Sequence, residues 1–150
     1  MGNNWTVRLD LVCDMDCIFC KIALKEIPAK ILVETDLCLG FLDAFPLAKG
    51  HALVIPKNHY EKIQNMPKEL NIELFTMVHE LISKIDSLTG STLVAVHNGK
   101  ESGQEIPHVH VHIIPRSKTD SAGAVHSMFK NDIKLTDVES SELCQNLKID

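Results

Sequence analysis

The chain has 150 residues, 45% of them apolar and 23% charged, which is the composition of a globular protein with one domain's worth of length. This composition excludes a disordered, collagen-like or coiled-coil chain. The net charge of −5 provides no general electrostatic reason to bind nucleic acid or an anionic membrane, so we expect neither as a partner.

The first predicted elements follow an arm, residues 1–16, that shows neither a helical nor a strand period. A short helix is predicted over residues 17–25. Two apolar runs, residues 31–35 and 37–43, are separated by a single aspartate and are predicted to form a hairpin. Residues 51–55 are predicted to form a third strand.

The strongest helical signal covers residues 67–89, where apolar residues recur at steps of three and four. Pro67 suits the first turn of a helix, and Gly90 suits a left-handed stop. Further strands are predicted at 92–96 and 108–114. Five strands with one long helix between the third and the fourth predict an α+β fold with a mostly antiparallel sheet.

The last predicted strand has the sequence HVHVHII, in which histidine alternates with valine. Because side chains alternate across a strand, His108, His110 and His112 should project from one face, and the intervening apolar residues should enter the core. Three imidazoles in a row can bind a metal, or they can act as nucleophile and acid–base partners. A solvated polar face is the alternative.

The five cysteines are an odd number, so they cannot all pair within one chain. Arg8, Asp10 and Asp14 interrupt the opening residues, which therefore lack the apolar core of a secretory signal. No apolar run approaches the roughly 20 residues that a membrane-spanning helix needs. We expect a reducing, cytoplasmic location, and nothing in the sequence argues against the nucleus.

Cys17 and Cys20 form a C-x2-C pair. In a reducing compartment such a pair indicates a zinc half-site or a redox pair, with core packing as the third interpretation. Isoleucine and phenylalanine between the cysteines fit a redox pair poorly. A zinc site needs two further nitrogen or sulfur ligands.

Three ordered blocks together resemble the histidine triad (HIT) superfamily. They are CIFCKI at 17–22, FLD at 41–43 with HALVIPKNH at 51–59, and SGQEIP at 102–107 with HVHVHII at 108–114. The blocks span about residues 17–116, and they look most like the Hint-like branch of nucleotide hydrolases and transferases.

The resemblance implies a HIT-like fold with a five-stranded sheet, a long helix and a short N-terminal helix, paired as a homodimer. It places the HIT domain at residues 17–116, after the arm of residues 1–16. Residues 117–150 are polar and weakly patterned. They are interpreted as a C-terminal tail packed on the domain or on its partner.

The resemblance also implies an enzyme that cleaves the α-phosphate bond of purine nucleoside phosphoramidates or related AMP conjugates. His110 would attack the α-phosphorus and form a covalent nucleotidyl-histidine, and His112 would contact the phosphate and help the leaving group. A dinucleoside polyphosphate hydrolase or nucleotidyl transferase is the close alternative. A nucleotide-binding interaction protein with incidental turnover is the alternative from another class.

The family pattern supplies the missing zinc ligands. It implies a structural zinc held by Cys17, Cys20, His59 and His108, which would fix the strand that carries the nucleophile. The free or redox cysteine pair and plain core packing remain alternatives.

The same resemblance outlines a nucleotide pocket. Asp43 would accept hydrogen bonds from the ribose hydroxyls, with a turn-capping aspartate as the alternative, and His51 would stand near the nucleophile. Many relatives have asparagine or glutamine where this chain has His97, and many Hint-like relatives have serine or threonine where Glu105 stands. The remaining candidates are the base-walling Ile18, Phe19, Ile22, Phe41, Leu42 and Ala44, with plain core as their alternative, and Gly103, Gln104 and Glu105 at the phosphate beside His97, His110 and His112.

Overall fold

The computed structural model describes residues 12–130 and 133–149. The chain divides after Asp120 into two units, residues 1–120 and 121–150. Most of the predicted arm, residues 1–11, lies outside the described residues.

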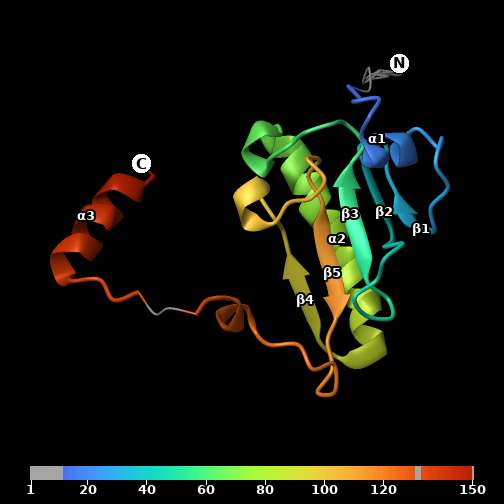
Figure 1. Ribbon diagram of the computed structural model, residues 1–150. Coiled ribbons are helices and arrows are strands. Elements are labelled where there is room, and N and C mark those ends of the chain that lie inside the picture. Colours follow the sequence, from blue (N-terminus) through green and yellow to red (C-terminus); the bar gives the residue numbers. More distant parts are fainter. Residues whose placement is uncertain (1–11, 131–132, 150) are drawn as a thin grey trace, which may run out of the picture. The chain divides into compact units, whose positions relative to one another are not determined.

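A five-stranded antiparallel sheet forms the centre of the first unit (Figure 1). The strand order across the sheet is β1-β2-β3-β5-β4, so the last strand in sequence lies between the third and the fourth. This confirms the predicted sheet, including the hairpin of the first two strands. The strands are β1 Ile31–Glu34, β2 Cys38–Leu42, β3 Ala52–Pro56, β4 Thr92–Ala95 and β5 Val111–Pro115.

Two helices cover opposite faces of this sheet. The long helix α2, Lys68–Thr89, packs its apolar stripe on one face. Pro67 caps it rather than forming its first turn, and Gly90 ends it in the left-handed conformation with φ of 78°. The short helix α1, Ile18–Ala23, packs with Leu39, Phe41, Leu53 and Ile55 on the other face. No helix within the described ranges is long and apolar enough to span a membrane.

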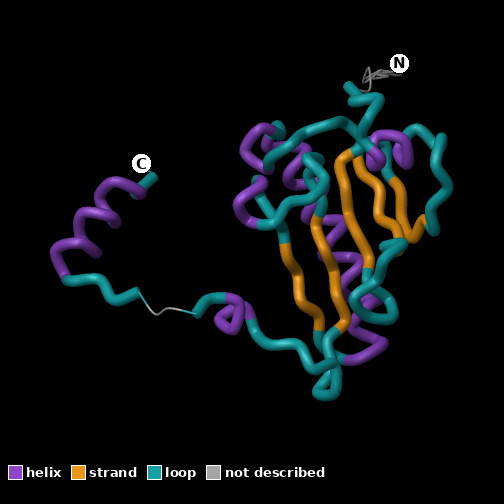
Figure 2. Tube along the Cα trace, viewed as in Figure 1, coloured by secondary structure: helices purple, strands orange, loops and turns teal. Residues whose placement is uncertain are grey.

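The histidine-bearing strand is shorter than predicted. Its ladder begins at Val111, and residues 108–110 lead into it as part of a loop (Figure 2). The last pair with β3 is Val54–Val111 and the last pair with β4 is Ala95–His112, and the Val109 N–H donates instead to the Tyr60 carbonyl at 2.7 Å. The alternation of faces survives, because Val109 enters the same core as Val111.

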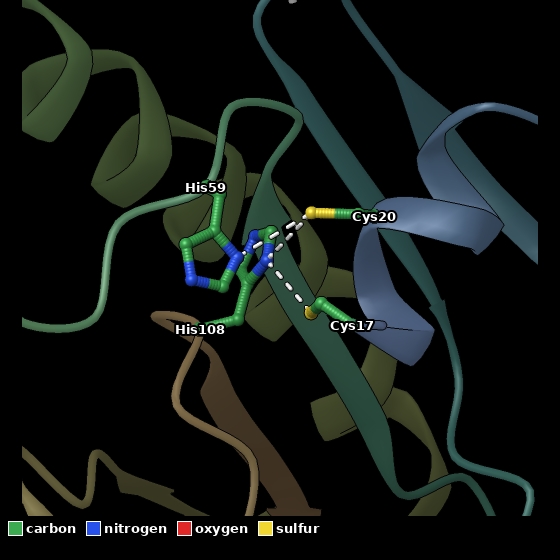
Figure 3. A group of neighbouring side chains, drawn as sticks. All are labelled: Cys17, Cys20, His59 and His108. Carbon is green, nitrogen blue, oxygen red and sulfur yellow. Dashed lines mark hydrogen bonds between the residues drawn. The ribbon is translucent and has the colours of Figure 1, made fainter. Parts of the chain in front are cut away.

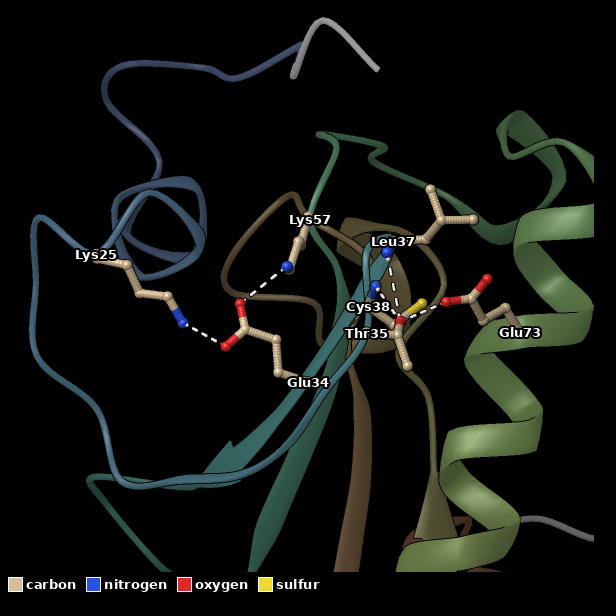
Figure 4. A network of polar contacts seen from close by, with 7 residues as sticks. All are labelled: Lys25, Glu34, Thr35, Leu37, Cys38, Lys57 and Glu73. Atoms are coloured by element: carbon tan, nitrogen blue, oxygen red, sulfur yellow. Dashed lines mark hydrogen bonds and ion pairs between the residues drawn. The ribbon is translucent and has the colours of Figure 1, made fainter. Parts of the chain in front are cut away.

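A network of polar contacts joins α1, the β1–β2 hairpin, β3 and α2 (Figure 4). Glu34 accepts from Lys25 at 2.7 Å and from Lys57 at 2.8 Å, and these hydrogen bonds, that of Lys25 first, lower the pKa of the Glu34 carboxyl. Thr35 donates to Glu73 of α2 and accepts from the backbone of the hairpin turn. Exposed ion pairs contribute about 0–1 kcal/mol each, so this network orients segments more than it stabilises them.

The second unit contains a helix that is absent from the prediction for residues 117–150. Helix α3, Asp137–Leu147, follows a short 3-10 turn, Val125–Met128. A capping box begins it, since the Glu139 N–H donates to Thr136 Oγ1 at 3.2 Å and the Thr136 N–H donates to the Glu139 carboxylate at 2.8 Å. The sequence TDVE at 136–139 is the pattern that identifies such a start. Packing of this unit on the domain stays a prediction.

Candidate active site and metal site

Three neighbouring strands bring three imidazoles together on one face of the sheet. His51 immediately precedes β3, His112 lies in β5, and His97 lies two residues beyond β4. His112 is in the middle, with its ring centre 5.2 Å from that of His51 and 5.6 Å from that of His97. The ring of His110 completes the group, 4.9 Å from that of His112.

Hydrogen bonds assign the proton positions on His51 and His112. The Leu47 N–H donates to His51 Nδ1 at 3.1 Å, so the proton of His51 is on Nε2. His51 Nε2–H then donates to His112 Nδ1 at 2.9 Å, with Asp43 Oδ2 3.5 Å from the same nitrogen. His112 is left with its proton on Nε2, and that N–H has no hydrogen-bond partner among the described residues.

His110 has the opposite arrangement. Its Nδ1–H donates to the His108 carbonyl at 2.7 Å, which leaves a lone pair on Nε2. Burial lowers the pKa of His110, and burial together with His110 lowers the pKa of His112 to about 4. Both rings are therefore neutral near pH 7. The Nε2 atom of His110 is unprotonated, and the Nε2 atom of His112 carries a proton.

These rings line a cavity of about 370 Å³, which lies within the size range of small-molecule sites. One end is apolar and is built by α1, β2 and the loop after β2. The other end is polar, with His97, Gly103 and Glu105. The full lining is Ile18, Phe19, Ile22, Phe41, Asp43, Ala44, Phe45, Leu47, His51, Leu53, His97, Gly103, Glu105, Ile106, His110 and His112.

Two of the predicted pocket residues do not line this cavity. Leu42 lies between Phe41 and Asp43, and strand alternation turns it to the sheet face opposite theirs. Gln104 turns inward from residues 99–105, the glycine loop, and its amide accepts from the Gly99 N–H and donates to the Glu61 carbonyl, both at 2.8 Å.

Four lining residues were not predicted. Phe45 and Leu47 follow Asp43 in an irregular loop, where no periodicity indicates direction. Leu53 faces the cavity by alternation in β3, and Ile106 precedes Pro107. The apolar dipeptides on both sides of Pro46 could have indicated Phe45 and Leu47 as pocket residues, because apolar residues in a loop need a packing partner or a ligand.

Most backbone N–H groups of the glycine loop donate hydrogen bonds to acceptors within the same loop. Ser102, Gly103 and Gln104 donate to carbonyls within the loop. Gly99 and Gly103 have φ of 115° and 97°, which favours glycine at both positions. Among the described residues, the Glu105 N–H has no hydrogen-bond partner, so it is available to a phosphate oxygen at the polar end.

Four side chains, Cys17, Cys20, His59 and His108, converge in a second group (Figure 3). Cys17 Sγ lies 3.4 Å and Cys20 Sγ 3.6 Å from His108 Nδ1, and Cys20 Sγ lies 3.4 Å from His59 Nδ1. All four potential ligand atoms lie within 4.8 Å of one another.

The protonation of this group suits a metal. His108 Nε2–H donates to the Pro56 carbonyl at 2.8 Å, so the Nδ1 lone pair points to the sulfurs, and burial lowers the pKa of His108 to about 4. Burial raises the pKa of the Cys20 thiol to about 12, an energetic penalty that a divalent cation removes by stabilising the thiolate. Two sulfur and two nitrogen donors form the set that tetrahedral zinc prefers.

The fold and the histidine-lined cavity define a class of small α+β proteins with a nucleotide-sized site. The model of the HIT domain family matches residues 24–119, and the chain belongs to that family. The domain predicted over 17–116 overlaps this match.

Relatives and solved structures support the same assignment. Adenylylsulfatase HINT3 of Arabidopsis thaliana is 41% identical over 85% of this chain, which spans just under two thirds (66%) of the HINT3 length. Adenosine 5′-monophosphoramidase HNT1 of Saccharomyces cerevisiae is 42% identical over 69% of this chain and 64% of its own. A zinc-bound histidine triad protein from Mycobacterium smegmatis has a TM-score of 0.63 at 32% identity, covering 71% of this chain and 79% of that one.

Proposed function

We propose that the protein hydrolyses AMP conjugates, purine nucleoside phosphoramidates foremost, through a nucleotidyl-histidine. The proposal depends mainly on two rings at the cavity wall, whose centres are 4.9 Å apart. The Nε2 atom of His110 is unprotonated, whereas the Nε2 atom of His112 carries a proton. The names of HINT3 and HNT1, a sulfatase and a phosphoramidase of adenylyl compounds, support this choice of substrate.

The first chemical step forms one bond and breaks one. The His110 Nε2 lone pair attacks the α-phosphorus, and the bond from phosphorus to the leaving atom breaks with its electron pair. The negative charge of the bound phosphate raises the pKa of His112, and its imidazolium form gives the Nε2 proton to the departing amine and returns to the neutral ring, which His51 supports from the other side. Water then attacks the same phosphorus and gives its proton to His112, and the electron pair of the phosphorus–nitrogen bond returns to His110.

The cavity determines how the nucleotide lies. The apolar end accommodates the base between α1 and β2, with Phe19 and Phe41 as aromatic walls. Asp43 is half-buried at the cavity edge and accepts the ribose hydroxyls, while its Oδ1 accepts from the Phe45 N–H at 2.9 Å. An apolar end with two aromatic side chains suits a purine base.

A structural zinc belongs to the same proposal. Cys17, Cys20, His59 and His108 would hold it, and zinc there would supply a structural junction rather than Lewis-acid chemistry. His108 connects that junction to the site, because its carbonyl holds the Nδ1–H of His110. We also place the protein in the cytoplasm, where thiols stay reduced.

The experiment is turnover with a panel of adenylyl compounds: the phosphoramidate, adenylyl sulfate and a dinucleoside polyphosphate, with AMP release followed by chromatography. Hydrolysis of the phosphoramidate fastest is the expected result. Preference for the polyphosphate would identify the alternative hydrolase. Tight AMP binding without turnover of any conjugate would contradict the enzyme and favour the interaction protein. A cytidine phosphoramidate serves as the control for purine selection.

We further propose a homodimer through α2 and β4. Ile72, Phe75 and Leu88 of α2 are 68%, 41% and 57% exposed, and Val94 of the edge strand is 40% exposed. The edge strand β4 lies beside these exposed apolar side chains, a combination that favours aggregation. A second copy of the chain would cover both. Light scattering at micromolar concentration should give twice the 16.7 kDa chain mass. A monomer that stays active would contradict this interface.

A further inference from the structure

His97 lies at the polar end of the cavity, and its ring makes no hydrogen bond within the described part of the fold. The ladder of β4 ends at Ala95, which pairs with His112, and two more residues in that antiparallel register set His97 opposite His110. The side chain is half-buried and lines the cavity. Neither ring nitrogen has a hydrogen-bond partner among the residues that the structure describes. An imidazole that the fold does not use is available to a ligand.

The order of the strands indicates which part of the ligand meets this ring. The apolar walls of the cavity come from α1, β2 and β3, the attacking His110 precedes β5, and His97 follows β4 at the far side. The α-phosphorus lies between the nucleoside and the leaving group in every conjugate. A base in the apolar end and a phosphorus over the β5 imidazoles therefore direct the leaving group toward β4 and His97.

The charges at this end restrict which leaving groups fit. Asp43 and Glu105 line the cavity, whereas no lysine or arginine does among the residues placed by the structure. An oxyanion leaving group, such as sulfate or phosphate, consequently depends on uncharged donors or on imidazoles. His97 supplies a ring N–H in either protonation state.

We propose that His97 is the specificity residue for anionic leaving groups, donating its N–H to an oxygen of a departing sulfate or phosphate. This inference rests on the proposed function. Sulfate leaves with the electron pair of the broken phosphorus–oxygen bond and needs no proton, so hydrogen bonds to its growing charge are the only assistance it can receive. An amine needs the proton of His112, and an additional donor assists it less.

Glu105 opposes His97 in the same selection. Its side chain is exposed at the cavity edge, so its carboxylate repels an oxyanion there and attracts an ammonium group. The pair His97 and Glu105 thus sets the ratio of sulfate to amine leaving groups, in opposite directions.

The test measures kcat/KM for adenylyl sulfate and for adenosine 5′-phosphoramidate with the wild type and three variants. The measured quantity is the sulfate-to-amidate ratio, in which losses of folding, dimerisation or nucleoside binding cancel. His97→Ala should lower this ratio about tenfold, because it removes a hydrogen bond to a charged group. His97→Gln should restore most of the ratio through its amide donor, and Glu105→Gln should raise it severalfold.

The possible outcomes distinguish a failure of the His97 inference from a failure of the proposed hydrolase function. A wild type that hydrolyses neither compound overturns both proposals. A wild type that hydrolyses only the amidate overturns the inference alone. A ratio within about twofold of wild type in His97→Ala also overturns it, since a hydrogen bond to a charged group is worth more than that. Circular dichroism of His97→Ala checks its fold, and His97→Gln, which conserves volume and polarity, carries the test if alanine is not tolerated.

Discussion

Replacing His110 by alanine is expected to reduce kcat at least about a thousandfold, because catalysis by a covalent nucleophile cannot continue without it. Within the described chain, His110 is the cavity imidazole whose Nδ1–H is fixed by a backbone carbonyl and whose Nε2 is left bare. Binding of AMP should largely survive, since the apolar walls and Asp43 are untouched. Steady-state kinetics and calorimetry measure the two quantities separately.

A trapping experiment distinguishes the nucleophile from a binding residue. Denaturant quenching of the wild type at alkaline pH during turnover should reveal chains heavier by one nucleotidyl group, and His110→Ala should show none. His110→Asn serves as the isosteric control, with a side chain that preserves the hydrogen bond to the His108 carbonyl but presents no ring lone pair. A kcat near that of the wild type in either variant would disprove the covalent mechanism.

The fold was predictable from the sequence where one period dominates. The alternation in HVHVHII and the three–four spacing of residues 67–89 predicted a strand and a helix, and both stand in the structure. The face of each residue followed from the same periods, which is why Val109 and Val111 are buried against α2. Element ends were predicted less well, because they depend on where pairing with neighbouring strands stops, as the last pairs Val54–Val111 and Ala95–His112 do for the start of β5.

The chemistry within the site required the sheet order. The bond from His51 to His112 joins residues 61 positions apart and exists because β3 and β5 are neighbours. Proton positions on the imidazoles depend on the Leu47 N–H and the His108 carbonyl, which no motif identifies. The inward turn of Gln104 depends likewise on the Glu61 carbonyl, 43 residues away.

The second large effect concerns zinc. Protein prepared without added metal should contain about one zinc per chain, and Cys17→Ser should lose it. We expect this variant to be destabilised by about 3 kcal/mol, or roughly 10 °C in melting temperature for a chain of this size. The substitution removes one ligand from a buried set of four. Elemental analysis and calorimetry measure the two effects.

Matched variants make this result specific. Cys144→Ser changes an exposed cysteine of α3 and should keep both zinc and melting temperature. His110→Ala should also keep zinc, because His110 lies outside the cluster of four ligands. Zinc retained in Cys17→Ser but lost in His110→Ala would instead place the metal among the imidazoles of the cavity.

Loss of zinc should also lower kcat at temperatures where Cys17→Ser is still folded. His108 belongs to both sites. Its own Nδ1 faces the sulfurs of Cys17 and Cys20. Its backbone carbonyl accepts a hydrogen bond from the Nδ1–H of His110, which keeps the Nε2 atom of His110 unprotonated. When the ring is released, the carbonyl is no longer fixed, and the nucleophile can take the wrong tautomer. KM should change less than kcat, because the walls of the nucleoside pocket remain. Equal kcat in folded, zinc-free Cys17→Ser and in wild type would show that the metal serves stability alone.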